Sequence, residues 1–194
     1  MLDLVFATNN AHKLEEVQAI VGDRFRIKSL DDIGCHDDIP ETGHTFRDNA
    51  RQKTDYLFSK YNVDCFGDDS GLEVDALNGE PGVYSARYSG SRDMEKNIDL
   101  VLERLARKED RTARFKTVIS LLLNGEQYFF EGAIEGRIIM ERRGEQGFGY
   151  DPIFIPDGYD KTFAEMSAEE KNKISHRAVA VQQLAAFLKE VSKG

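Results

Sequence analysis

Two adjacent carboxylates, Asp68 and Asp69, are the residues of this chain whose types and spacing best suit the binding of a cation. An apolar run ends at Phe66 and a glycine, Gly71, follows, so the pattern predicts a strand that ends near residue 66, a sharp turn, and the two acids at the strand tip. Neighbouring carboxylates repel each other and bury poorly unless a positive charge joins them. A hard divalent cation with oxygen ligands meets that need, and an ordinary polar turn of the same composition is the alternative.

The turn after the first apolar run, residues 2–7, has the composition of a phosphate contact. A helical pattern starts at residue 12, and the free N–H groups and dipole of a helix start favour an anion. The glycines of a Walker loop are absent, and a simple helix cap is the alternative. Thr8, Asn10 and Lys13 would add donors for the phosphate. The candidate substrate-binding residues of the turn are Thr8, Asn9, Asn10, Ala11, His12 and Lys13.

Glu41 and Lys53 extend this charged set. Glu41 lies in the loop 38–43, which leads into a predicted helix over residues 45–61 that carries Lys53. Glu41 is a candidate third carboxylate for the cation, and Lys53 is a candidate phosphate contact. A solvated acid and a surface lysine are the alternatives for each residue taken alone.

Residues 147–152 read Gly-Phe-Gly-Tyr-Asp-Pro, and glycines on both sides of Phe148 would allow its ring to lie against a flat ligand. A hydrophobic packing contact is the alternative. The long Gly-rich loop 79–90, with its aromatic residues and an arginine, is either a wall of the same site or a structural wrap.

Ser175 is a plausible N-cap for the amphipathic helix predicted over residues 175–189. It would place His176 and Arg177 on the first turn, where cations oppose the helix dipole. Because that placement costs stability, it favours a functional reason for the two cations.

The elements that position these segments alternate between strand and helix at the start of the chain, and a hairpin follows in the middle. Residues 124–125 read Asn-Gly, a hairpin turn signal. The predicted strands are 2–7, 25–29, 114–123 and 127–132, and the predicted helices are 12–21, 45–61, 94–105 and 175–189. This order predicts an α/β protein with a mixed sheet.

Composition limits the classes of function. The 194 residues fit one domain, with or without two lobes, and 40% hydrophobic residues are too many for a disordered chain. A formal net charge of −9 argues against binding to a nucleic-acid backbone. The two cysteines, Cys35 and Cys65, are too few for a disulfide framework. No apolar run approaches membrane-spanning length, so we expect a soluble, cytoplasmic protein.

Seven ordered blocks of sequence, spread over nearly the whole chain, resemble the inosine triphosphate pyrophosphatases. The blocks are Thr8-x-Asn10-x-x-Lys13, Glu41-Thr42-Gly43-x-Thr45-Phe46, Asn49-Ala50, Asp68-Asp69-Ser70-Gly71-Leu72, residues 81–88 (PGVYSARY), residues 147–152 (GFGYDP) and Ser175-His176-Arg177. Two positions depart from the usual pattern: Asn9 stands where glycine is common, and Pro40 stands where many members have a second acid.

The resemblance implies an elongated mixed β-sheet that forks into two lobes around a central cleft, with residues 1–194 as a single two-lobed domain. It implies a homodimer that needs Mg²⁺ and hydrolyses non-standard purine nucleoside triphosphates (ITP, dITP and XTP) to the monophosphate and pyrophosphate, which cleanses the nucleotide pool.

The resemblance also implies a role for individual residues. Asp69 would be the general base, and Asp68, Asp69 and Glu41 would hold the metal. The substrate-binding set would comprise the turn 8–13 and Lys53 with Ser70, Phe148, Gly149, Tyr150, Asp151, Lys171, His176 and Arg177. In that set Thr8, Asn10, Lys13 and Lys53 would bind the triphosphate, and Phe148 would stack on the base. The residues that would frame the base are Asp151, Lys171, His176 and Arg177.

Three competing interpretations come from other classes. The septum-formation-associated nucleotide pyrophosphatases open with a Ser-Ala-Ser-Pro-Arg-Arg type of turn, which residues 8–13 do not match. A phosphatase with an aspartyl nucleophile needs Asp-x-Asp-x-Thr after the first strand, and that strand ends in Ala7-Thr8. A nucleotide sensor without catalytic activity would bind ITP with Mg²⁺ and release no pyrophosphate.

Overall fold

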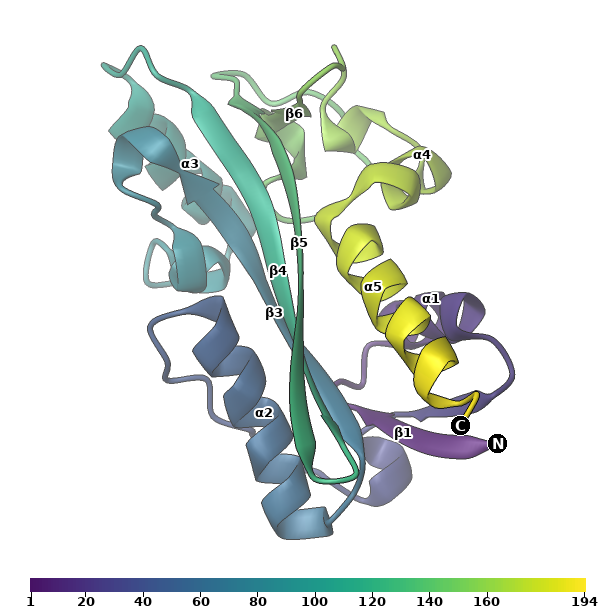
Figure 1. Ribbon diagram of the computed structural model, residues 1–194. Coiled ribbons are helices and arrows are strands. Elements are labelled where there is room, and N and C mark those ends of the chain that lie inside the picture. Colours follow the sequence, from purple (N-terminus) through teal and green to yellow (C-terminus); the bar gives the residue numbers. More distant parts are fainter. The chain divides into compact units, whose positions relative to one another are not determined.

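Six strands form one mixed sheet in the order β2-β1-β3-β4-β5-β6 in the computed structural model, which describes residues 1–194 (Figure 1). The strands are β1 (Leu2–Phe6), β2 (Phe25–Lys28), β3 (Cys65–Val74), β4 (Thr112–Leu123), β5 (Glu126–Ile138) and β6 (Phe154–Pro156). The helices are α1 (Ala11–Val21), α2 (Phe46–Tyr61), α3 (Met94–Leu105), α4 (Ala168–Ile174) and α5 (His176–Val191). Strand β1 pairs in parallel with β2 and β3, and β5 pairs antiparallel with β6, so the predicted mixed α/β sheet is confirmed.

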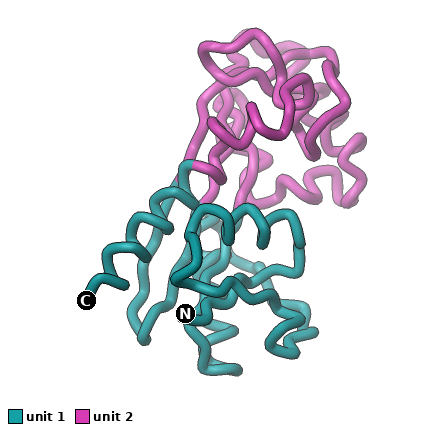
Figure 2. Tube along the Cα trace, turned by 90° about the vertical axis from the view of Figure 1, so that its right-hand side faces the viewer, with its two compact units in different colours: residues 1–69, 118–131, 179–194 teal, residues 70–117, 132–178 magenta.

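The chain divides into two compact units, which Figure 2 shows in different colours. Unit 1 comprises residues 1–69, 118–131 and 179–194, and unit 2 comprises residues 70–117 and 132–178. Strands β3, β4 and β5 each contribute residues to both units.

In unit 1 different helices pack against the two faces of the sheet. Leu4, Phe6 and Phe66 pack with residues of α1 and α5 on one face. Val5 and Cys65 pack with Leu57 of α2 on the other face (Figure 1). Successive residues of a strand point to opposite faces, so each face of β3 is assigned to one helix layer.

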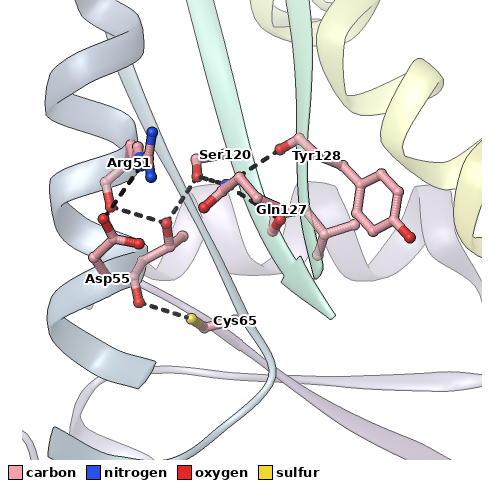
Figure 3. Close-up of polar contacts among 8 residues, drawn as sticks. Arg51, Asp55, Cys65, Ser120, Gln127 and Tyr128 are labelled. Carbon is pink, nitrogen blue, oxygen red and sulfur yellow. Dashed lines mark hydrogen bonds and ion pairs between the residues drawn. The ribbon is translucent and has the colours of Figure 1, made fainter. Parts of the chain in front are cut away.

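A chain of buried hydroxyl groups ties α2 to the sheet. Thr54 donates to the Arg51 carbonyl at 3.0 Å, and its oxygen lies 2.7 Å from the Ser120 hydroxyl, which therefore supplies the proton of that second contact. Gln127 of β5 donates to Ser120 in turn, and Figure 3 shows Ser120 on β4 between Gln127 and the helix. Directional contacts of this kind fix which residues of α2 face the sheet.

Unit 2 has its own apolar core, in which α3 packs against β3 and β4. Ile98, Val101 and Leu105 of α3 are almost fully buried with Leu72 and Phe115. The predicted helix over 94–105 is confirmed to the residue, and Asp93 caps it by accepting from the Glu95 N–H. Helix α4 was not predicted, although Ser167 and Glu170 form a capping box that the sequence displays.

The predicted turn at the two acids is wrong. Asp68 and Asp69 lie in the middle of β3, which runs from Cys65 to Val74, and Gly71 is a strand residue. Gly67 serves close packing instead: a Cβ there would lie 3.1 Å from the Lys53 Cβ and 3.4 Å from the Ala7 Cβ.

Candidate active site

Asp68 and Asp69 point to opposite faces of β3, because adjacent strand residues alternate. Asp68 continues the face of Phe66 toward α1, and its Oδ2 lies 3.4 Å from the Lys13 Nζ. Asp69 continues the face of Cys65 toward α2, and its Oδ2 accepts a 2.9 Å hydrogen bond from the Asn49 side-chain amide. The sequence neighbours therefore have different partners.

The Asp69 carboxyl has a pKa raised to about 6. Burial is the main cause, since it disfavours the charged form, and the hydrogen bond from Asn49 opposes it. The negative charges of Glu41 and Asp68 raise the pKa further, while Lys53 lowers it. A carboxyl with this pKa is a stronger base than a solvated aspartate and is still mostly ionised at neutral pH.

Lys53 lies on α2 at the centre of the acidic residues. Its Nζ lies 2.5 Å from the Glu41 Oε1 and donates to the Asp68 carbonyl at 2.7 Å. Burial lowers the pKa of this ammonium, but the charges of Asp68 and Glu41 outweigh burial and hold the pKa above its ordinary value. We call Lys13, Glu41, Lys53, Asp68 and Asp69 the carboxylate–lysine group; all five lie in unit 1.

The turn 8–13 is a helix cap as well as a candidate anion site. Asn10 caps α1 by accepting from the Lys13 N–H at 3.2 Å, and Thr8 accepts from the Asn10 N–H. The Asn9 side chain accepts from the Asp31 N–H at 2.8 Å and so holds the turn to the loop after β2. Ala11 and His12 are exposed on the first turn of the helix.

The carboxylate–lysine group has the donor chemistry for a hard cation. No three carboxylate, cysteine or histidine side chains are already arranged around one cation position. Its three carboxylates outnumber its two lysines, and the negative charges of Glu41 and Asp68 add to the effect of burial in raising the pKa of the Asp69 carboxyl. A divalent cation would relieve that excess of negative charge, so these residues fit such an ion.

Phe148 lies in unit 2 on a loop whose backbone depends on two glycines. Gly147 and Gly149 have φ of 76° and 61°, in the left-handed region that disfavours other residues. A Cβ at residue 147 would lie 2.2 Å from the Asp151 Oδ2. The Phe148 ring is 64% exposed, so this flat apolar surface is available to a ligand.

Asp151 and Lys171 form a largely buried ion pair next to that ring. The Lys171 Nζ lies 2.5 Å from the Asp151 Oδ2, which also accepts from the Phe148 N–H at 3.0 Å. The ammonium lies 4.2 Å from the centroid of the Phe148 ring, and the Arg177 guanidinium lies 5.9 Å from it. We call Phe148, Asp151, Lys171 and Arg177 the aromatic–cation group; all four lie in unit 2.

The other predicted residues of unit 2 are more buried. Tyr150 is 3% exposed and its hydroxyl donates to the Ser85 carbonyl at 2.6 Å, so its side chain is already engaged within the protein. The Ser70 hydroxyl donates to Thr117 at 2.7 Å. His176 is 8% exposed and stacks on Phe115, with the ring centroids 5.2 Å apart. As predicted, Ser175 caps α5 by accepting from the Ala178 N–H.

Asn49 is a residue of this site to which the sequence analysis gave no role. It lies on the first turn of α2 and is 3% exposed. The available signal was a polar residue on the apolar face formed by Phe46, Ala50 and Leu57, since a buried amide needs hydrogen-bond partners.

Comparison with known proteins gives relatives over nearly the whole chain. A dITP/XTP pyrophosphatase of Christiangramia forsetii is 52% identical over 188 residues, which are 96% of this chain and 99% of the relative. A dITP/XTP pyrophosphatase of Bacillus subtilis is 47% identical over 193 residues, 97% of this chain and 98% of the relative.

Solved structures also match this chain over nearly its whole length. The Ham1 protein of Staphylococcus aureus matches with a TM-score of 0.92 at 41% identity, over 97% of this chain and 98% of that one. A HAM1 protein of Coxiella burnetii matches with a TM-score of 0.93 at 40% identity, over 98% of this chain and 100% of that one. No helix here is both long and apolar enough to cross a membrane. The model of the Ham1 family matches residues 4–187, and this chain belongs to that family.

Proposed function

We propose that this protein is a nucleoside triphosphate pyrophosphatase that acts on non-standard purine nucleotides, namely dITP, XTP and ITP. The relatives named dITP/XTP pyrophosphatase support the activity and the first two substrates. The observation that carries the proposal is the partly buried Asp69 carboxyl, which has a raised pKa and lies beside Lys53 and Glu41. ITP is included because it carries the same hypoxanthine base as dITP.

Unit 1 supplies the residues for the triphosphate. A triphosphate carries about three to four negative charges, and cations aimed at the leaving pyrophosphate give the electrostatic stabilisation on which phosphoryl transfer depends. Lys13 and Lys53 are the candidate cations, and Thr8 and Asn10 hold the start of α1. Local cations of this kind bind an anion despite the net charge of −9.

Asp69 is the general base of the proposed reaction. It accepts a proton from a water molecule whose oxygen bonds to the α-phosphorus, while the bond from that phosphorus to the bridging oxygen breaks and pyrophosphate leaves with the electron pair. The pKa of about 6 keeps the carboxyl mostly ionised at neutral pH and makes it a better proton acceptor than a solvated aspartate.

Mg²⁺ is the proposed cofactor, and Glu41, Asp68 and Asp69 are its proposed ligands. The ion would neutralise phosphate charge and polarise the attacking water. Asp68 and Asp69 face opposite sides of β3, so Asp69 and Glu41 on the α2 side are the stronger pair of candidate ligands.

Unit 2 supplies the residues that would bind the purine base of the substrate. Phe148 offers a flat surface, and Lys171 and Arg177 offer donors to the 6-oxo group of hypoxanthine or xanthine. Adenine carries an amino donor there, so it would leave these cations unmatched. A mispaired buried polar group costs about 1–3 kcal/mol, and two such contacts give roughly 10²- to 10⁴-fold selectivity.

The test is pyrophosphate release from dITP, ITP, XTP, ATP, GTP and a pyrimidine triphosphate, each with Mg²⁺ and with a chelator. We expect release from the first three with Mg²⁺ only, and the Asp69→Asn variant controls for contaminating hydrolases. Nucleotide binding without pyrophosphate release would make the protein a sensor, and a preference for the pyrimidine would contradict the purine assignment. We also propose a cytoplasmic homodimer, and the mass of the purified protein in solution tests the dimer.

A further inference from the structure

Both ends of the Asn49 side-chain amide are used. Its Nδ2 donates to the Asp69 Oδ2 at 2.9 Å, and its Oδ1 accepts from the Gly43 N–H at 2.7 Å. A backbone N–H can only donate and an ionised carboxylate can only accept, so the partners fix the orientation of the amide. Asn49 therefore connects three segments: the loop before α2, α2 itself and strand β3.

The contact with the loop requires a glycine. A Cβ at Gly43 would lie 2.7 Å from the Asp48 Cβ and 2.8 Å from the Asn49 Oδ1, closer than real Cβ atoms approach other atoms. The absence of a side chain thus lets the loop lie directly on the first turn of α2. Glu41, the carboxylate that contacts Lys53, is two residues earlier in the same loop.

The loop has further anchors along α2. The Thr42 N–H donates to the Gln52 Oε1 at 2.9 Å, and the Asp37 carboxylate accepts from the Tyr56 hydroxyl at 2.7 Å. Gln52 and Tyr56 hold the loop to the helix, and Asn49 also holds the Asp69 carboxylate. This difference separates residues that only anchor the loop from the residue that also aligns the Asp69 carboxylate.

We propose that Asn49 is a positioning residue that sets the Asp69 carboxylate at a fixed place relative to the loop that carries Glu41. The inference rests on the proposed function, in which Asp69 is the base and Glu41 a metal ligand. Asn49 is 3% exposed, so it acts through Asp69 and Gly43 and not by touching substrate. Small errors in the placement of a reacting group reduce turnover much more than they reduce substrate binding.

The Asn49→Asp variant is the sharpest test in the enzyme. It keeps the shape and the acceptor for Gly43 but replaces the donor to Asp69 by a second carboxylate. We expect kcat for dITP to fall about 10- to 100-fold while KM changes less than about threefold, because the phosphate and base contacts are untouched. If Asn49→Asp does not fold, Gly43→Ala replaces it as the test. This variant disturbs the same contact from the loop side and should lower kcat in the same way.

Two matched controls separate alignment from stability. Gln52→Ala removes a loop anchor one helical turn away without touching Asp69. Thr54→Val, on the same helix, removes the buried contact to Ser120 of β4. Both should lower the melting temperature and keep kcat within about threefold. The proposal is wrong if Asn49→Asp loses no more kcat than these controls, or if it raises KM at unchanged kcat.

A second measurement needs no activity and so separates this inference from the proposed function. If Asn49 couples Asp69 to the loop, the metal-free Asp69→Ala variant should exchange the Gly43 amide hydrogen faster than the unsubstituted protein, although Gly43 does not bond to Asp69. Unchanged exchange at Gly43 would overturn the coupling. An inactive unsubstituted protein with the expected exchange would refute the proposed function and leave the coupling standing.

Discussion

In unit 1 most of the charged side chains lie on regular elements, Asp68 and Asp69 in the middle of β3 and Lys53 on α2, and Glu41 lies in the loop before α2. In unit 2, by contrast, Phe148 lies on a loop between two glycines. The carboxylate–lysine group is held by partly buried contacts such as the hydrogen bond from Asn49 to Asp69. The Phe148 ring is 64% exposed. Chemistry at one phosphorus atom needs fixed geometry, and a base-stacking surface tolerates some adjustment, so the two groups should respond to mutation in different ways.

The largest effect should come from the proposed base. Asp69→Asn keeps the shape and can still accept the hydrogen bond from Asn49, but it cannot accept a proton. We expect kcat to fall by at least ~10²-fold with little change in KM. Steady-state kinetics with dITP measure this, and near-normal turnover of the variant would move the role of base to Asp68 or Glu41.

The next largest effect should come from the lysines of unit 1. Lys53→Ala and Lys13→Ala each remove a cation from the phosphate end and should lower kcat/KM by about 10²-fold. Because every nucleoside triphosphate carries the same three phosphates, the ratio of ITP to ATP hydrolysis should stay nearly constant. Lys173→Ala, on the exposed side of α4, is the matched control. A large change in the ratio of ITP to ATP hydrolysis would mean that these lysines contact the purine ring and not the phosphates.

The aromatic–cation group should show the reverse pattern. Arg177→Ala should lower kcat/KM for ITP about 10- to 100-fold, the value of a hydrogen bond from a charged donor, and should lower that for ATP much less. Arg177→Lys keeps the charge and tests whether the guanidinium geometry matters. Equal losses for both nucleotides would assign Arg177 to the phosphate or ribose that the two substrates share.

The two groups also differ in how far the sequence predicts them. Local signals were sufficient for the Ser175 cap and for the Asn124-Gly125 hairpin turn, where both residues have positive φ. The glycines around Phe148 were likewise predicted to free the ring, and it is exposed.

The carboxylate–lysine group was predicted less well because its geometry comes from distant segments. Gly71 suggested a turn, but β3 continues through it, and the nearby Gly67 serves the close approach of α2. The opposite faces of Asp68 and Asp69 follow from that continuous strand. The bridge through Asn49 joins residues 43 and 69, whose proximity no local pattern reports.

The smallest effect concerns the stability of unit 1 without metal, and it tests whether Asp69 sits under electrostatic strain. The pKa of Asp69 is about 6 in the folded chain, against about 3.9 for an unfolded aspartate. Between these values the folded state holds a proton that the unfolded state has lost, so stability falls as pH rises from about 4 to about 6 and is then constant.

Asp69→Asn avoids this penalty because an amide does not ionise. In a chelator at pH 7.5 we expect its free energy of unfolding to exceed that of the unsubstituted protein by on the order of 2 kcal/mol, and the two should agree at pH 4. Asp3→Asn is the control of opposite sign: Arg26 and Lys28 lower the pKa of Asp3 to about 2, so this variant should be less stable at neutral pH, and its deficit should shrink as pH falls from about 4 toward 2. Urea unfolding at pH 4, 5, 6 and 7.5 measures the Asp69→Asn profile, and the same measurement extended to pH 3 and pH 2 measures the Asp3→Asn profile. Parallel pH profiles for Asp69→Asn and the unsubstituted protein would mean that the Asp69 carboxylate does not destabilise the fold. The fixed alignment assigned to unit 1 would then not lower the free energy of unfolding.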